Sequence, residues 1–385
     1  MIYNLSIKEK FKYRAASLIL FTLLFTGCVV ISKTPIENIA GISASSGELI
    51  RVEVLNSVKI VRVRGAKKGV SLMKSTPEGL LSVNGSIYER FTLTPLDISG
   101  AGTQGFIYID GRPYRGTLEV RGTDKGLQII NELYLEDYLA GLINNEISSS
   151  WPLESVRAQA IIARTYALYQ KEKRAEEEFH LSGTDKDQVY KGSATEDNAA
   201  FRAVQDTRGE VLTYNGELAL TLYHSNAGGR TESAANVWGS DFKYLRSVRS
   251  PKDNSARNFE WTFTIGAGAL ERSLKTAGFD IEKVRAVQVR EKTASRRVKK
   301  LQVTGSGSRI ELTGERLRSI LGYGNIRSTL FRVRKRGGSF VFIGKGSGHG
   351  VGLSQWGAKG MADAGRKYRG ILSYYYPGTR LQKLY

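Results

Sequence analysis

Length, composition and charge narrow the classes of protein to which this chain can belong. With 385 residues, 41% of them hydrophobic, it is a globular chain with enough material for two packed units after a leader. The 57 Lys and Arg residues outnumber the 37 Asp and Glu residues and give a net charge of +20, which favours an anionic partner: nucleic acid, a membrane surface or an acidic polymer. The single cysteine excludes an intrachain disulfide and a cysteine-based zinc site.

Residues 1–28 have the pattern of an export signal. Basic residues precede an apolar stretch from Ala15 to Phe25, which is about half the length needed to span a bilayer. The stretch ends in LFTGC, which resembles a bacterial lipoprotein cleavage box and predicts lipidation of Cys28 and membrane anchoring. An ordinary cleaved signal peptide is the alternative. Both predict an exported protein of the cell envelope, in the periplasm or on the outer membrane face, so a wall polymer is favoured over nucleic acid.

The rest of the chain divides by composition into three parts. Residues 29–45 are small and polar and predict a tether. Residues 46–131 contain short β-branched segments separated by turns, with hairpin turns in LSVNGS and IDGRPYRG, and predict a β-rich part. Residues 132–385 combine helical patterns with strand patterns, including a hairpin that turns at Gly337 and Gly338. The predicted fold class is α+β.

The segment ELYLEDYLAGLINNEI predicts a helix that carries a carboxylate on its apolar face. Leu135, Leu139, Leu142 and Ile143 recur at helical spacing, and Glu146 falls on the same face near the helix C-terminus. Partial burial and the helix dipole both raise the pKa of a carboxyl group there, as a general acid requires. The alternative is a glutamate at a frayed helix end that reaches solvent.

The segment SSSWPLESVRAQAIIARTYALYQ predicts a second helix, capped by one of its serines. Glu154 is explained as a first-turn acid. Arg164 lies within the apolar face and needs a carboxylate partner, for which Glu146 and Glu154 are nearest in sequence. The alternative is an arginine whose stem packs while its head reaches solvent.

The strand LALTLYHS carries His224 and Ser225. Neighbours in a strand point to opposite faces and GxSxG is absent, so this pair does not predict a catalytic triad. His180, His224 and His349 lie far apart in sequence and HExxH is absent, so no metal site is predicted. His224 is expected to hydrogen-bond in a cleft; a structural histidine is the alternative.

Glycines occupy every second position from Gly344 to Gly352, and this run fits neither phosphate-loop pattern. As one strand it would leave a bare face for close approach by a flat ligand, followed by Ser354 as helix N-cap and by Gln355 and Trp356, which offer an amide and a stacking plane. Together these suit an extended sugar ligand. On this reading Gly350→Val blocks binding without unfolding the protein; a tight packing site is the alternative.

Four ordered motifs resemble the stage II sporulation protein D / amidase-enhancer family over residues 114–385. They are YLAGLINNEISSSWPLESVRAQAIIARTYAL, DQVYKG, HSNAGGRTESAANVWG with YLRSV, and GHGVGLSQWGAKGMA with YYYPGT. The resemblance implies peptidoglycan as target and lytic transglycosylase activity, with Glu146 as the catalytic acid and base. One carboxylate then suffices, because the 6-hydroxyl of the muramic sugar attacks the anomeric carbon. The alternative is a non-catalytic murein binder that stimulates a cell-wall amidase.

The remaining site roles follow from residue type. Strand binding is assigned to His349, Ser354, Gln355, Trp356, His224, Ser225 and Gly350, and support of the acid to Arg164, Tyr166 and Glu154. Some relatives carry zinc-binding cysteines after the HS pair, but this chain has Ala227, Arg230 and Asn236 in that region, so neither zinc nor another cofactor is predicted.

Two basic clusters lie on predicted hairpins, around residues 290–300 and 332–336. Such clusters are usually solvated faces, and in an exported protein they can also hold anionic glycan or lipid head groups.

Overall fold

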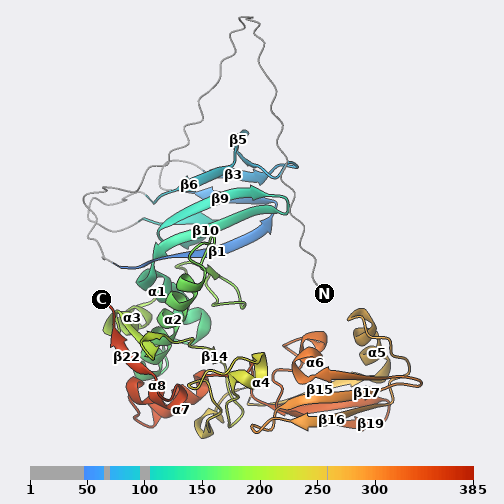
Figure 1. Cartoon of the computed structure of the whole chain (residues 1–385). Helices are drawn as coiled ribbons and strands as arrows, with labels where there is room; N and C mark the ends of the chain where they lie inside the picture. The colour runs from blue at the N-terminus through green and yellow to red at the C-terminus, as the bar shows by residue number, and fades with distance from the viewer. Residues whose placement is uncertain (1–46, 65–69, 96–104, 258) are drawn as a thin grey trace, which may run out of the picture. The chain divides into compact units, whose positions relative to one another are not determined.

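The computed structural model describes residues 47–64, 70–95, 105–257 and 259–385. The predicted signal, Cys28 and the tether lie outside the described residues. Two sheets form the N-terminal part (Figure 1). The first has the order β11(Leu181–Ser182), β1(Leu49–Val58), β10(Gly126–Tyr134), β9(Thr117–Thr123), β6(Arg90–Leu93). The second has the order β5(Ser86–Tyr88), β4(Leu81–Val83), β3(Val70–Ser75), β2(Ile60–Arg64), β7(Ile107–Ile109), β8(Arg112–Tyr114).

The alternation of side chains along these strands builds one core between the sheets. Ile50 and Val52 of β1 and Val61 and Val63 of β2 are buried in the same hydrophobic cluster, as period-two patterning requires. The two predicted hairpins are confirmed. β4 and β5 pair across Asn84–Gly85, and β7 and β8 pair across Asp110–Gly111, with positive φ at all four turn residues.

The predicted helices are confirmed as α1(Leu135–Glu146) and α2(Leu153–Lys173), and α3(Asn198–Asp206) packs against both. The predicted serine cap of α2 is wrong. Its N-cap is Pro152, with no side-chain capping bond, whereas Ser149 donates its hydroxyl to Asp197 and receives no helix N–H. The serines instead stabilise the connection between the helices.

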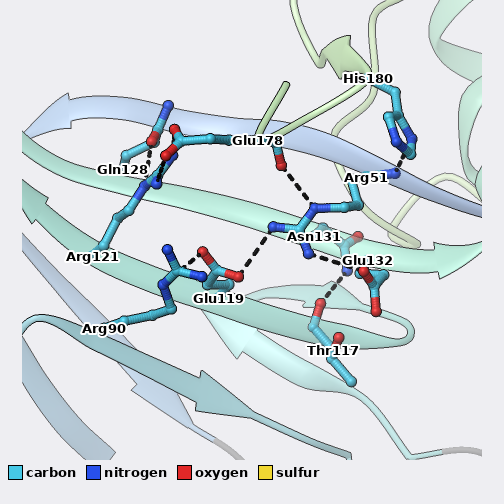
Figure 2. Close-up of polar contacts among 10 residues, drawn as sticks. All are labelled: Arg51, Arg90, Thr117, Glu119, Arg121, Gln128, Asn131, Glu132, Glu178 and His180. Atoms are coloured by element: carbon cyan, nitrogen blue, oxygen red, sulfur yellow. Dashed lines mark hydrogen bonds and ion pairs between the residues drawn. The ribbon is translucent and has the colours of Figure 1, made fainter. Parts of the chain in front are cut away.

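A polar network joins the first sheet to the segment after α2 (Figure 2). Arg51 contacts Glu132 at 2.9 Å and Glu119 at 3.0 Å, and its Nε donates to the carbonyl of Glu178 at 2.7 Å. The Arg51 N–H also donates to His180 Nδ1 at 3.1 Å. This network places β11 parallel to β1, and so fixes the start of the loop that contains Gln188.

The C-terminal elements form two further groups. One contains β12(Glu210–Tyr214), β13(Glu217–Leu218), β22(Arg380–Lys383), α4(Ala234–Trp238), η1(Pro251–Asp253), α7(Gln355–Asp363) and α8(Tyr368–Tyr375). Its core includes Leu353, Ile371 and Tyr376 and packs on α2.

The other group contains the sheets β15(Glu260–Gly266)-β20(Ser339–Lys345)-β19(Phe331–Arg336) and β16(Ala286–Lys292)-β17(Val298–Thr304)-β18(Arg309–Thr313), with α5(Ala267–Thr276) and α6(Gly314–Leu321). The predicted hairpin is confirmed, because β19 pairs with β20 across Gly337–Gly338. Helices and strands segregate as the α+β prediction requires. Among the described residues, no helix has both the length and the apolar character needed to cross a membrane.

Candidate active site around Glu146

Glu146 is the last residue of α1, and its carboxylate is half-buried. Its Oε1 accepts a hydrogen bond from the backbone N–H of Val189 at 2.8 Å, and the side chains of Tyr223 and Gln355 also hydrogen-bond to it. Burial raises the pKa of the Glu146 carboxyl, while the three hydrogen bonds act in the opposite direction; burial dominates. The group therefore holds its proton at a higher pH than an exposed glutamate does.

A short parallel strand pair brings Tyr223 and Gln355 to this carboxylate. β14(Tyr223–His224) pairs with β21(Leu353–Ser354), and α7 begins at Gln355 directly after β21. The Ser354 hydroxyl accepts the N–H of Gly357 at 3.2 Å, which confirms it as the N-cap of α7. Three segments that are far apart in sequence therefore meet at one carboxylate.

Buried amides and hydroxyls hold these groups in place. Tyr138 donates to Gln188 Oε1 at 3.1 Å, and Gln188 Nε2 donates to the Tyr223 hydroxyl at 3.3 Å. The amide of Gln355 lies 3.5 Å from Oε1 of Gln159. Because Tyr223 already accepts from Gln188, its own proton is free for the Glu146 carboxylate, and burial raises the pKa of Tyr223 well above its usual value. Tyr223 is thus a fixed donor.

Two tryptophans lie in the immediate neighbourhood. The rings of Trp151 and Trp356 have centroids 4.9 Å apart at an interplanar angle of 57°, and both side chains are half-buried. Trp356 follows Gln355, and the backbone N–H of Trp356 donates to the carbonyl of Ser225 at 3.0 Å. Half-buried aromatic rings offer a stacking surface for a flat ligand. Ser225 contributes here through its backbone.

The two histidines near the site have structural hydrogen bonds. His349 Nε2 donates to the carbonyl of Tyr223 at 2.9 Å and its Nδ1 accepts from the N–H of Val351 at 3.1 Å, so both ring nitrogens are occupied. His224 Nδ1 donates to the carbonyl of Val351 at 3.0 Å. Burial lowers the pKa of His349 to about 4, which keeps it neutral. Among the described residues, the Nε2 of His224 is buried without a hydrogen-bond partner, and His349 is partly buried and lines a cavity of about 210 Å³ with Glu232 and Asn236. The exposed Trp238 ring lies 5.1 Å from the His349 ring. Strand binding by the two histidines stays a prediction.

The predicted continuous strand across the glycine run is wrong. β20 ends at Lys345 and β21 begins at Leu353, and between them Gly346, Gly348, Gly350 and Gly352 all have φ between +73° and +102°. Strand alternation requires an extended backbone, whereas these glycines adopt the left-handed region. A Cβ on the buried Gly350 would lie 2.5 Å from Nη2 of Arg297. Gly350 is therefore a packing position, as the alternative to a substrate wall expected.

The predicted supporting residues have other partners. Arg164 binds Glu136 through Nε at 2.9 Å and Nη2 at 2.7 Å, and so contacts neither Glu146 nor Glu154. Tyr166 donates to Asp187 at 2.7 Å. Glu154 pairs with Arg157 at 2.7 Å, and Ser354 is fully buried with its hydroxyl in contact with Asp253 at 3.3 Å. The contacts of these side chains, including Ser354, which was predicted to bind the strand, stabilise the fold around the site.

Among the described residues, no group of three or more His, Cys, Asp or Glu side chains is arranged to hold a metal ion. His224 and His349 have ring centroids 5.5 Å apart, whereas His180 bonds to Arg51 in the N-terminal sheet. The three histidines do not converge.

Comparison with known proteins shows the family. A family model described as "Stage II sporulation protein" matches residues 123–214, and one for a domain of unknown function (DUF8618) matches residues 234–352.

An uncharacterized protein of Brachyspira hyodysenteriae is 33% identical over 72% of this chain and 74% of its own length. Stage II sporulation protein D of Bacillus amyloliquefaciens is 30% identical over 66% of this chain and 76% of its own length. The amidase enhancer of Bacillus subtilis is 32% identical over 72% of this chain, but only 45% of its own length is covered. The chain belongs to the stage II sporulation protein D / amidase-enhancer family.

The site contains residues that the sequence reading missed. Tyr223 precedes His224 in the same strand, Trp151 lies within SSSWP, and Gln188 lies within the DQVYKG motif. The last two stood in motifs that already carried the family resemblance, so each could have been assigned to the site. Tyr223 gave no such signal, because only the β14–β21 pairing brings it to Glu146.

The packing of Gly350 makes the stability of Gly350→Val a test of the loop. Valine at φ +87° is strained and its side chain meets the buried Arg297, so we expect the free energy of unfolding to fall by about 2–5 kcal/mol. Urea unfolding measures this. Gly365→Val is the matched control, since Gly365 has φ +84° with open space around its Cβ, and a smaller loss is expected. A Gly350→Val protein of unchanged stability that no longer binds murein would restore the substrate-wall interpretation.

Proposed function

We propose that this protein is a lytic transglycosylase that cleaves peptidoglycan glycan strands, with Glu146 as general acid and base. The observation that carries the proposal is a half-buried carboxyl whose pKa is raised by burial, with the Val189 N–H at 2.8 Å and Tyr223 and Gln355 as further donors. Membership of the family and the relative named amidase enhancer support a role at the cell wall.

The proposed reaction uses one carboxyl group in two steps. Protonated Glu146 donates its proton to the glycosidic oxygen as the bond to the anomeric carbon breaks. The carboxylate then removes the proton from the 6-hydroxyl of the same muramic sugar, whose oxygen attacks the anomeric carbon and closes a 1,6-anhydro ring. No water is consumed, so the second carboxylate of a hydrolase is unnecessary. Asp187, in the loop that also provides Val189, is already bound by Arg174 and Tyr166.

The surroundings of Glu146 suit both halves of this cycle. Burial favours the protonated acid, and the donors Tyr223, Gln355 and Val189 stabilise the carboxylate that remains after proton transfer. The Trp151–Trp356 pair offers a surface on which a sugar ring of the strand stacks.

A non-catalytic role is the second candidate, because the Bacillus subtilis relative is named amidase enhancer. In that case the protein binds murein and stimulates a separate cell-wall amidase, and Glu146 contributes only to binding. The two candidates differ in whether the protein alone releases anhydro products.

Glu146→Gln tests the catalytic role. Loss of the acid should lower the rate of glycan cleavage by about 10²- to 10⁴-fold, measured as 1,6-anhydromuramic products by mass spectrometry of purified murein strands. Glu154→Gln is the matched control, since Glu154 pairs with Arg157, and it should retain activity. A wild type that releases no such product but stimulates an amidase would favour the enhancer role. Full activity of Glu146→Gln would move the acid to another residue.

Tyr223→Phe tests whether the Tyr223 hydroxyl lowers the pKa of Glu146. The Tyr223 hydrogen bond favours the ionised carboxylate, so its loss should raise the pKa of Glu146 further. Because the acid must be protonated, the rate falls as pH rises through this pKa, and the alkaline limb of kcat/KM should move to higher pH in Tyr223→Phe. Tyr374→Phe, which removes a hydroxyl bonded to the Arg249 carbonyl, should leave the profile unchanged. An unshifted limb in Tyr223→Phe would contradict the assignment of Glu146.

The proposal includes a location in the cell envelope through a lipid on Cys28. Cys28→Ser should abolish incorporation of labelled palmitate and move the protein from the membrane to the soluble fraction after cell fractionation, because no acyl chain remains to hold it. A Cys28→Ser protein that stays with the membrane would favour a retained signal segment as anchor.

A further inference from the structure

The edge strands β16 and β19 carry basic side chains at alternating positions. The two strands lie side by side (Figure 1), and Val287, Val289 and Val333 face the hydrophobic core beneath them. The intervening residues therefore face solvent. They include Arg290, Lys292, Arg332, Arg334 and Arg336, all exposed. We call this set the basic track.

The basic track continues into a groove of about 560 Å³. Arg332 and Lys292 belong to both, and the groove is further lined by Arg230, Arg296 and Lys345. Its one carboxylate is that of Glu260, which lies 2.9 Å from Lys345 and is thereby neutralised. Glycines 228 and 229 form part of the wall, so backbone is accessible between the cations.

These charges lack local compensation. Within the described part of the chain, Arg230, Lys292, Arg296, Arg332, Arg334 and Arg336 form no ion pair. Alternating residues of a strand stand about 6.6–6.8 Å apart, so the like charges repel each other in the free protein. A ligand with regularly repeated negative charges would relieve this repulsion and release the counterions that the track gathers.

We infer that the basic track and its groove form a second binding site, which takes an anionic polymer chain with phosphate or carboxylate groups. Most of the cations are arginines, whose planar guanidinium matches the oxygens of both groups. The groove accommodates a chain, and the exposed β16–β19 face lets that chain continue beyond it. This inference does not depend on the chemistry of Glu146.

Two other anionic partners fit the surface less well. A bilayer is flat, and membrane-binding faces add apolar residues to their cations; the large exposed hydrophobic side chains of the described residues lie outside β16 and β19. Single-stranded nucleic acid is held by exposed aromatic rings on which bases stack. Phe331, the aromatic residue in the groove wall, is buried. A polymer without bases is therefore favoured.

The test compares two triple variants of the full chain, both in a Cys28→Ser background so that no acyl chain contributes. Arg332→Gln/Arg334→Gln/Arg336→Gln removes three charges of the track. Lys59→Gln/Lys74→Gln/Lys125→Gln removes three exposed charges of the N-terminal strands and their turns. Binding is measured by fluorescence anisotropy on a labelled glycerol-phosphate oligomer and on poly-L-glutamate, and by sedimentation with phosphatidylglycerol vesicles, over a series of salt concentrations.

The track variant should bind the oligomers about tenfold or more weakly at about 0.15 M salt, with a shallower dependence of log K on log salt, while the control variant binds like the parent. The oligomer whose binding is weakened more in the track variant identifies phosphate or carboxylate as the ligand group. The inference is overturned if the parent binds neither oligomer, if both variants lose binding equally, or if only vesicles respond to the track. Cleavage of short soluble glycan strands should be unchanged in the track variant, so failure here is separable from failure of the proposed catalysis.

Discussion

The buried ion pair between Arg164 and Glu136 is the interaction on which the part of the fold around Glu146 depends. Two parallel hydrogen bonds of 2.9 and 2.7 Å join the guanidinium on α2 to the carboxylate on α1. The remaining donors reach the carbonyls of Glu210 and Val204, and Tyr385 donates to Glu136 at 2.7 Å. A buried charge is tolerated only when an opposite charge and hydrogen bonds satisfy it as completely as they do here. The pair thereby joins both helices to α3, β12 and the last residue of the chain.

This anchoring determines where the Glu146 carboxylate lies. Glu146 follows Glu136 by ten residues, or about 15 Å along a helix, so the direction of α1 sets the position of its final side chain. At that end, desolvation raises the pKa and donors from two other segments limit the rise. Neither influence suffices alone. Burial without donors would leave an unstable carboxylate after proton transfer. Donors without burial would lower the pKa of the carboxyl, so that it would be ionised and would have no proton to donate.

The sequence allowed the prediction of features that depend on local periodicity. The helix ending at Glu146, the hairpin at Gly337 and the Ser354 cap follow from residues within a few positions of each other. Features that depend on distant contacts were not predicted. Helical spacing showed that Arg164 needs a carboxylate but could not select Glu136, 28 residues earlier. A glycine at every second position is compatible with a strand and with repeated left-handed turns, and only packing against Arg297 decides between them.

The range of electrostatic forces distinguishes the two proposed sites. The pKa of Glu146 responds chiefly to burial and to the donors Val189, Tyr223 and Gln355. At physiological salt, exposed charges are screened beyond about 8 Å, so the cations of the basic track act on groups close to their own surface. Under the two proposals, the basic residues that contribute to the net charge of +20 bind a polyanion, whereas the chemistry takes place at the half-buried carboxyl of Glu146. Under the same proposals, changes in the basic residues alter where the protein is held, and changes around Glu146 alter what it does there.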